Sequence, residues 1–219
     1  MENIFIRSIT DYCERISNGI FSEPINLFSN LLFFISAFLI FKIFKKNKIK
    51  KLIYWLLLFF ITLIGIGSSL WHSFRNPFTL KLDALPIYLF ILIFLYLVLR
   101  KLLNNKWKPL IFVTSFIVIQ VLISILFPKA LNGSIRHVIN SLIFVFLIIW
   151  IHEKELLNKY FIISFLLYFF GIIFRSTDNE VCNIFPLGTH FLWHICTSLA
   201  TYYSVIALLN LEITNDNFS

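Results

Sequence analysis

The chain has 219 residues, of which 59% are hydrophobic, and its mean hydropathy is +0.86. Soluble domains contain about 45–50% apolar residues, so this composition disfavours a soluble globular protein. The net charge of +8 invites a nucleic-acid-binding interpretation, but no basic soluble segment with interleaved aromatic residues exists to carry it, and we expect no nucleic-acid partner.

The chain begins with a polar segment, residues 1–24, which we expect to lie outside the membrane. Charged residues are spread through its first fifteen positions, which predicts that no signal peptide is cleaved there. Asp11, Glu14 and Glu23 are acidic, and Asn18 and Asn26 lie nearby. Such clustered oxygen ligands suit Ca²⁺. Acid-rich loops are also common as solvated helix caps, and the residues alone favour that second interpretation.

Seven segments are long and apolar enough to be membrane-spanning helices, which need about 20 mostly apolar residues. They are residues 25–44, 52–74, 83–99, 107–127, 134–152, 160–174 and 186–210. The connections are short, and no internal repeat is evident. The predicted fold is an all-α bundle of seven transmembrane helices, forming a single domain over residues 1–219.

The distribution of positive charge predicts the orientation of this bundle. Twelve of the 19 Lys and Arg residues fall in the first, third and fifth connections, and the other seven fall on the opposite side. Cytoplasmic loops carry the excess of Lys and Arg. We therefore expect an outside or lumenal N-terminus and a cytoplasmic C-terminus.

Three of the five histidines fall where this topology brings them together. His72 ends the second span, whereas His190 and His194 open the seventh, and Asp83 starts the third. All four are then expected in the outer half of the bundle. Ser68 precedes His72 by four residues, on the same helical face. Ionisable groups inside a membrane are costly and indicate function by default.

Three imidazoles and a carboxylate match a catalytic zinc site that keeps one open position. Zinc with neutral ligands lowers the pKa of bound water toward about 7, and a nearby carboxylate such as Asp83 can move its proton. A serine hydroxyl such as that of Ser68 can stabilise a developing oxyanion. The alternative is that the histidines only hydrogen-bond between helices. His137 and His152 lie at predicted helix ends, and we expect them to be interfacial.

Two of the three cysteines, Cys13 and Cys182, fall on the predicted outer side. A disulfide between them would suit an oxidising compartment, and two free thiols are the alternative. Cys196 lies inside the seventh span, where we expect it to act as a small apolar residue.

A series of short motifs, in order along nearly the whole chain, resembles the alkaline ceramidases, which belong to a superfamily of seven-helix membrane hydrolases that includes the adiponectin receptors. The motifs are D-Y-C-E from Asp11, E-P-I-N-L-F-S-N from Glu23, S-S-L-W-H from Ser68, L-D-A-L-P from Leu82, D-N-E-V-C from Asp178 and H-F-L-W-H from His190. The most specific part is Ser68-x3-His72, Asp83 in the next helix, and His190-x3-His194 in the last helix.

The resemblance implies a role for each matching residue. His72, His190 and His194 correspond to zinc ligands, Asp83 to the acid beside the zinc-bound water, and Ser68 to the serine of the site. It also implies a calcium site and a disulfide. The implied calcium ligands are Asp11, the backbone carbonyl of Tyr12, Glu14, Glu23 and Asn26, and the implied disulfide joins Cys13 to Cys182. The chain departs from the family at Ile16, where we expect an asparagine ligand that Asn18 is placed to replace.

The sequence therefore predicts a zinc-dependent intramembrane hydrolase, with Ca²⁺ as a second cofactor, that cleaves the amide bond of ceramide into a sphingoid base and a fatty acid. Three alternatives stay open. They are a hydrolase of another N-acyl lipid, a zinc-binding membrane receptor or sensor, and a transporter with a proton relay, although transporter-type inverted repeats are missing. The expected membrane is either a bacterial plasma membrane or a membrane of the ER/Golgi type.

Overall fold

The computed structural model describes residues 12–15, 17, 19–128 and 130–216, with side chains described up to Leu211. Its helices, in chain order, are α1 (Pro24–Ser29), α2 (Leu31–Lys46), α3 (Leu52–Phe74), α4 (Pro77–Leu103), α5 (Lys108–Leu126), α6 (Ile135–Glu153), α7 (Lys159–Thr177), the short 3₁₀ helix η1 (Asp178–Glu180) and α8 (His190–Asp216). No strand occurs among these described residues.

Seven spans within the described part of the chain are long and apolar enough to cross a membrane, which confirms the predicted all-helical, seven-span fold. The first span, Pro24–Lys46, joins α1 and α2. On α5, Ile111, Val118 and Ile125 are 57–69% exposed, as expected for a helix that faces lipid. The protein is therefore a multi-pass integral membrane protein. Its orientation in the membrane stays a prediction.

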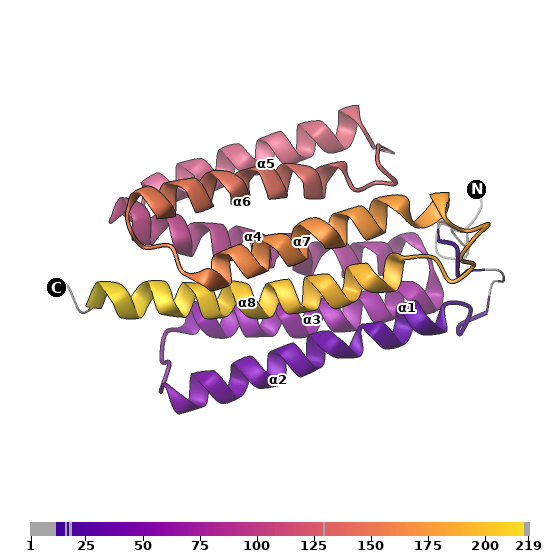
Figure 1. Ribbon diagram of the computed structural model, residues 1–219, viewed down its shortest axis with the longest axis horizontal. Helices are drawn as coiled ribbons and strands as arrows, with labels where there is room; N and C mark the ends of the chain where they lie inside the picture. The colour runs from indigo at the N-terminus through magenta and orange to yellow at the C-terminus, as the bar shows by residue number, and fades with distance from the viewer. Residues whose placement is uncertain (1–11, 16, 18, 129, 217–219) are drawn as a thin grey trace.

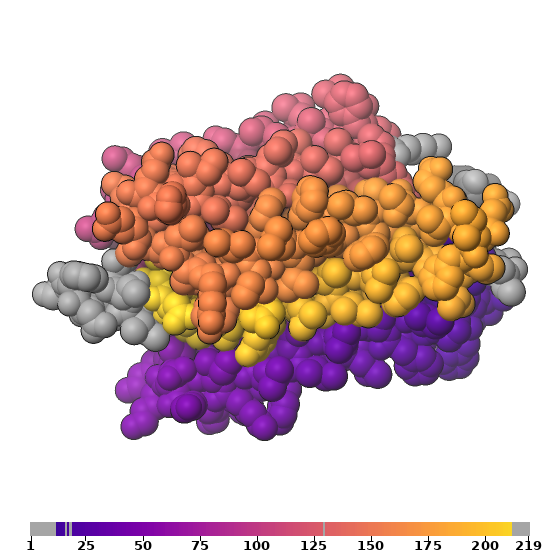
Figure 2. Space-filling view, in the orientation of Figure 1, coloured from indigo at the N-terminus to yellow at the C-terminus, as the bar shows by residue number. Residues whose placement is uncertain are grey.

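The helices run side by side along the long axis, with the described connections gathered at the two ends (Figure 1). Helix α8 packs against α1, α2, α3, α4 and α7, which makes it the central element. Figure 2 shows the side chains of α7 and α8 across the face toward the viewer and those of α2 along the lower edge. The apolar core includes Leu57 of α3, Val98 of α4 and Leu208 of α8, all almost fully buried.

Several helices extend beyond their predicted ends, and the start of α4 and the end of α7 matter most for the site. Helix α4 begins at Pro77, because Asn76 forms a capping box with Thr79 and a proline at the first helical position is favoured. Asp83 consequently lies inside α4 and does not start it. Helix α7 continues past residue 174 to Thr177 and then into η1.

Helices α3 and α4 approach closely at Gly67. A Cβ atom at Gly67 would overlap the backbone carbonyl oxygen of Leu82. That carbonyl is available because Pro86, four residues later, has no N–H group to donate to it. The close approach sets Ser68 and Asp83, the next residue along each helix, beside one another.

The N-terminal segment is tied to the connection between α7 and α8 by a disulfide between Cys13 and Cys182, whose Cα atoms are 5.1 Å apart. Asp178 reinforces this link, since its carboxylate accepts hydrogen bonds from the backbone N–H groups of Cys13, Thr189 and His190. The carboxylate thus also accepts hydrogen bonds from backbone N–H groups at the start of α8 that have no partner within the helix.

We expect Gly67→Ala to destabilise the bundle by about 1–3 kcal/mol, because a methyl group at the backbone contact forces α3 and α4 apart. Gly65→Ala is the matched control and should destabilise less, since a Cβ atom there would meet side-chain atoms of Phe34 and Phe33 at 3.0–3.1 Å and no backbone carbonyl. The measurement is the thermal unfolding midpoint (Tm) of the detergent-purified proteins. Equal Tm values for the two variants would contradict the backbone-contact argument.

Candidate metal centre

The three predicted metal-binding histidines meet at the end of the bundle that also holds the N-terminal segment. His72 lies in the last turn of α3, and His190 and His194 lie in the first turns of α8. All three are at most 2% exposed, and one potential ligand atom from each lies within 4.8 Å of the others. Among the residues that the structure describes, they form the one such group of three.

Hydrogen bonds on the far side of two rings determine which nitrogen atoms face the centre. His72 Nδ1 lies 2.6 Å from Glu23 Oε2, and a carboxylate oxygen accepts, so Nδ1 carries the proton. Ser29 Oγ lies 2.7 Å from His194 Nδ1 and donates its own proton to the Asn26 carbonyl. Ser29 therefore accepts from His194 Nδ1–H. In both rings the unprotonated Nε2 points to the centre, and the two Nε2 atoms are 3.2 Å apart.

The third ring is positioned by stacking. Tyr12 lies against His190 with ring centroids 3.7 Å apart and an interplanar angle of 22°. The Tyr12 hydroxyl in turn accepts a hydrogen bond of 2.9 Å from Arg175 Nη1. His190 Nδ1 is buried and has no hydrogen-bond partner in the protein. A buried nitrogen without a partner is costly, unless a bound ligand satisfies it.

Ser68 and Asp83 lie beside this group, on the wall of an internal cavity. Both line the cavity together with His194, and the Ser68 hydroxyl lies beside the Asp83 carboxylate. Ser68 is 3% exposed. The structure thus brings together a hydroxyl, a carboxylate and the imidazole of a candidate metal ligand at one cavity surface.

The cavity is mostly apolar below this polar end. It is partly open to the exterior and holds about 90 Å³ of free volume. Phe94, Phe116 and Leu147 are among its lining residues. A mostly apolar cavity that begins beside the histidines matches a molecule that has an alkyl chain attached to a polar group.

The predicted calcium ligands lie around the histidines, and those described have other partners. Glu14 accepts hydrogen bonds from the backbone N–H groups of Ile25 and Asn26 at the start of α1, as a helix-capping carboxylate does. Burial raises the pKa of Glu14, while those two backbone hydrogen bonds oppose the rise. Asp11 and Asn18 lie outside the described residues.

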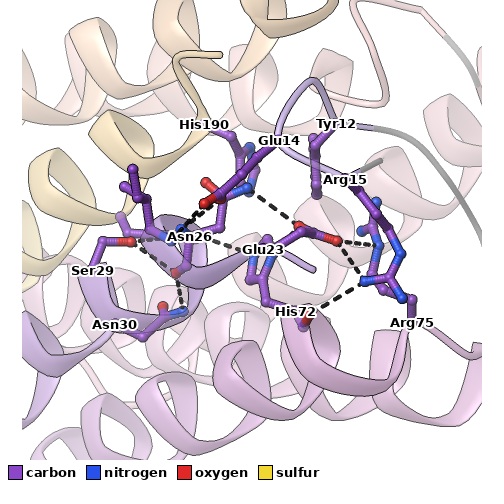
Figure 3. A network of polar contacts seen from close by, with 12 residues as sticks. Tyr12, Glu14, Arg15, Glu23, Asn26, Ser29, Asn30, His72, Arg75 and His190 are labelled. Atoms are coloured by element: carbon purple, nitrogen blue, oxygen red, sulfur yellow. Dashed lines mark hydrogen bonds and ion pairs between the residues drawn. The ribbon is translucent and has the colours of Figure 1, made fainter. Parts of the chain in front are cut away.

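Glu23 is fully buried and central to a network of polar contacts (Figure 3). Its Oε2 atom contacts His72, and its Oε1 atom lies 2.9 Å from both Arg15 Nη1 and Arg75 Nε. Burial by itself raises the pKa of Glu23. The hydrogen bond with His72 and the positive charges of Arg75 and Arg15 outweigh burial and hold the pKa below its usual range.

Several residues around the histidines were not identified from the sequence. Arg15, Arg75 and Ser29 hold the site through Glu23 and His194. Asp178 holds the N-terminus of α8, and its place in the D-N-E-V-C motif was the available signal. His137 is buried between Tyr168 and Trp193, with the Tyr168 hydroxyl of α7 as its polar neighbour. His152 is exposed, and the interfacial position of both histidines stays a prediction.

Comparison with known proteins agrees with this arrangement. No curated protein matches the chain significantly. A family model described as Ceramidase matches residues 6–218, which is nearly the whole chain. The chain therefore belongs to the ceramidase family, which supports a hydrolase that acts on amide bonds.

Proposed function

We propose that the protein is a zinc-dependent intramembrane hydrolase that cleaves ceramide into a sphingoid base and a fatty acid. One observation carries the zinc assignment. The Nε2 atoms of His72 and His194 face each other at 3.2 Å while the Nδ1 atom of each ring donates a proton elsewhere. Two lone pairs at that separation in a buried site repel each other, and a cation between them turns the repulsion into attraction.

The donor set supports zinc in particular. Three neutral imidazoles from His72, His190 and His194 are the ligands of a catalytic zinc site, and tetrahedral bonds of about 2.0–2.1 Å separate two ligand nitrogen atoms by roughly 3.3 Å. The His72–Glu23 pair matches the carboxylate–histidine contacts that hold zinc ligands in place. When bound, zinc lowers the pKa of a water molecule and polarises a carbonyl group.

The protein groups on the cavity wall supply the proton transfers. Asp83 accepts a proton from the water that attacks the amide carbon, and it later delivers that proton to the nitrogen of the departing amine. The Ser68 hydroxyl donates a hydrogen bond to the oxygen on which negative charge develops. The C–N bond breaks, the carbonyl carbon keeps the hydroxyl oxygen as a fatty acid, and the sphingoid base leaves as a free amine.

The cavity determines how the lipid is held. The amide lies beside Asp83 and His194, and the alkyl chain lies along the apolar wall formed by Phe94, Phe116 and Leu147. Ceramide enters laterally from the bilayer, since its chains never need to leave an apolar environment. We expect this site to lie toward the outer or lumenal leaflet, because most of the positive charge lies in the first, third and fifth connections.

Detergent-purified protein is expected to release sphingosine from ceramide, and His194→Ala is expected to abolish both release and bound zinc. The control is His152→Ala, because His152 is exposed. Sphingosine is quantified by mass spectrometry, and zinc by inductively coupled plasma mass spectrometry. Folded, zinc-loaded protein that releases no sphingosine would contradict ceramide as the substrate, leaving another N-acyl lipid or the receptor alternative.

Asp83→Asn is expected to keep its zinc and lose about 10²–10⁴-fold in kcat, because the amide cannot accept the proton from water. Ser68→Ala should lose less, about 10²–10³-fold at most, since it removes one donor to the oxyanion. The test is steady-state ceramide hydrolysis beside zinc content. Full activity in zinc-loaded Asp83→Asn would exclude the proton-transfer role.

Glu23→Gln is expected to weaken zinc binding about 10–100-fold, because the charged acceptor for His72 Nδ1–H is lost. Glu180→Gln is the control, since Glu180 is an exposed acid in η1. Zinc affinity is measured by competition with a chelator of known zinc affinity. Unchanged affinity in Glu23→Gln would show that His72 does not depend on this carboxylate.

A further inference from the structure

The N-terminal segment resembles a calcium site by its residues, but its described donor atoms do not fit one. Ca²⁺ takes six to eight oxygen ligands. The Tyr12 carbonyl accepts the N–H group of Arg15, and each Glu14 oxygen accepts a backbone N–H group at the start of α1. Asn26 Oδ1 is the one described oxygen of the set that lacks a hydrogen-bond partner. Even if the oxygen atoms that already accept one N–H group are counted, Tyr12, Glu14 and Asn26 offer four oxygen ligands, fewer than the six to eight of a calcium shell.

Glu23 offers still less room for a second metal ion. Its Oε1 atom already lies 2.9 Å from two guanidinium nitrogen atoms, and its Oε2 atom contacts His72 Nδ1 and Asn26 Nδ2. Figure 3 shows Arg15 and Arg75 converging on this carboxylate from one side and His72 from the other. Burial weakens screening, so two guanidinium charges at this range strongly oppose a divalent cation at the same oxygen.

The two arginines also supply the links that a bound ion would provide. Arg15, in the N-terminal segment, joins Glu23 to the His72 carbonyl in α3, with Nη1 2.9 Å and 3.4 Å from those oxygen atoms. Arg75, after the end of α3, is fully buried, and its guanidinium group lies 4.4 Å from the Tyr12 ring and 4.2 Å from the Trp71 ring. The segment, the start of α1 and the end of α3 are thus held together by fixed positive charge.

The backbone conformation at the end of α3 helps to fix the position of Arg75. Its φ angle of 48° is in the left-handed region, where it ends α3, and a side chain other than glycine adopts that conformation at a cost. The cation–π contacts and the ion pair with Glu23 compensate for that cost. The buried Arg75 guanidinium group is therefore a positive charge that every folded molecule contains beside Glu23.

We propose that Arg15 and Arg75 take the place of calcium in this chain. They hold Glu23, and through it the His72 ring, so that the protein neither binds Ca²⁺ at the N-terminal segment nor needs Ca²⁺ for activity. The activity half of this inference rests on the proposed function, whereas the binding half does not. Arg15 and Arg75 are positioning residues, because they act on the site only through Glu23 and the backbone.

The first test is the Tm of full-length protein, purified in detergent with calcium-depleted buffer and then titrated with CaCl₂. A calcium site with a Kd of about 10 µM would raise the Tm by roughly 5–10 °C at 1 mM CaCl₂. We expect no shift beyond that given by 1 mM MgCl₂, which controls for ionic strength. A rise of several degrees specific to CaCl₂ would overturn the proposal.

The second test asks whether Arg15 supplies the positive charge beside Glu23 that a calcium ion would otherwise provide. Arg15→Gln should lower the Tm by roughly 5–15 °C, since it leaves part of a buried carboxylate charge uncompensated. Lys81→Gln removes an exposed positive charge near the start of α4 and should change little. In the double variant Arg15→Gln/Glu23→Gln, the loss should be clearly less than the sum of the single losses. Additive losses would refute the link between the two residues.

Ceramide hydrolysis then separates this inference from the proposed function. With zinc held constant, we expect the same kcat/KM in calcium-depleted buffer and in 1 mM CaCl₂. A rate that requires CaCl₂ would overturn calcium independence while supporting a ceramidase. A protein inactive in both buffers would count against the proposed function, and the Tm titration would still decide whether Ca²⁺ binds.

Discussion

The buried carboxylate of Glu23 is the contact on which the metal centre depends. It is shared by an imidazole from α3 and by two guanidinium groups, one before α1 and one after α3. A lone buried carboxylate would be strongly destabilising. With these partners, Glu23 joins the N-terminal segment, the first span and the second span. The position of the N-terminal segment and the orientation of the His72 ring therefore depend on the same carboxylate.

A second carboxylate performs the corresponding task for the last helix. Asp178 accepts three backbone N–H groups, two of them at the start of α8, directly where His190 begins the helix. The ligands on α3 and α8 are thus each held by an acid contributed from elsewhere in the chain. With these acids at the helix ends, most of the cavity wall beyond the histidines is apolar, as a lipid chain requires.

The sequence was sufficient to predict the seven spans and the gathering of Ser68, His72, Asp83, His190 and His194, because ionisable residues in apolar spans are few and topology fixes their depth. It was insufficient for the partners of Glu23. Acids and arginines in a polar segment have many alternative pairings, and only the packed fold selects among them. The early start of α4 was readable in principle, since Asn76, Pro77 and Thr79 form a recognisable helix start.

The position of two ligands on α8 has a consequence for biosynthesis. Helix α8 is the last of the seven spans to leave the ribosome, and the disulfide partner Cys182 precedes it by only a few residues. Six inserted helices therefore carry a single histidine of the centre and no complete set of ligands. The group of three histidines can therefore assemble only after α8 has been made, and a molecule truncated before the last span lacks two of the three.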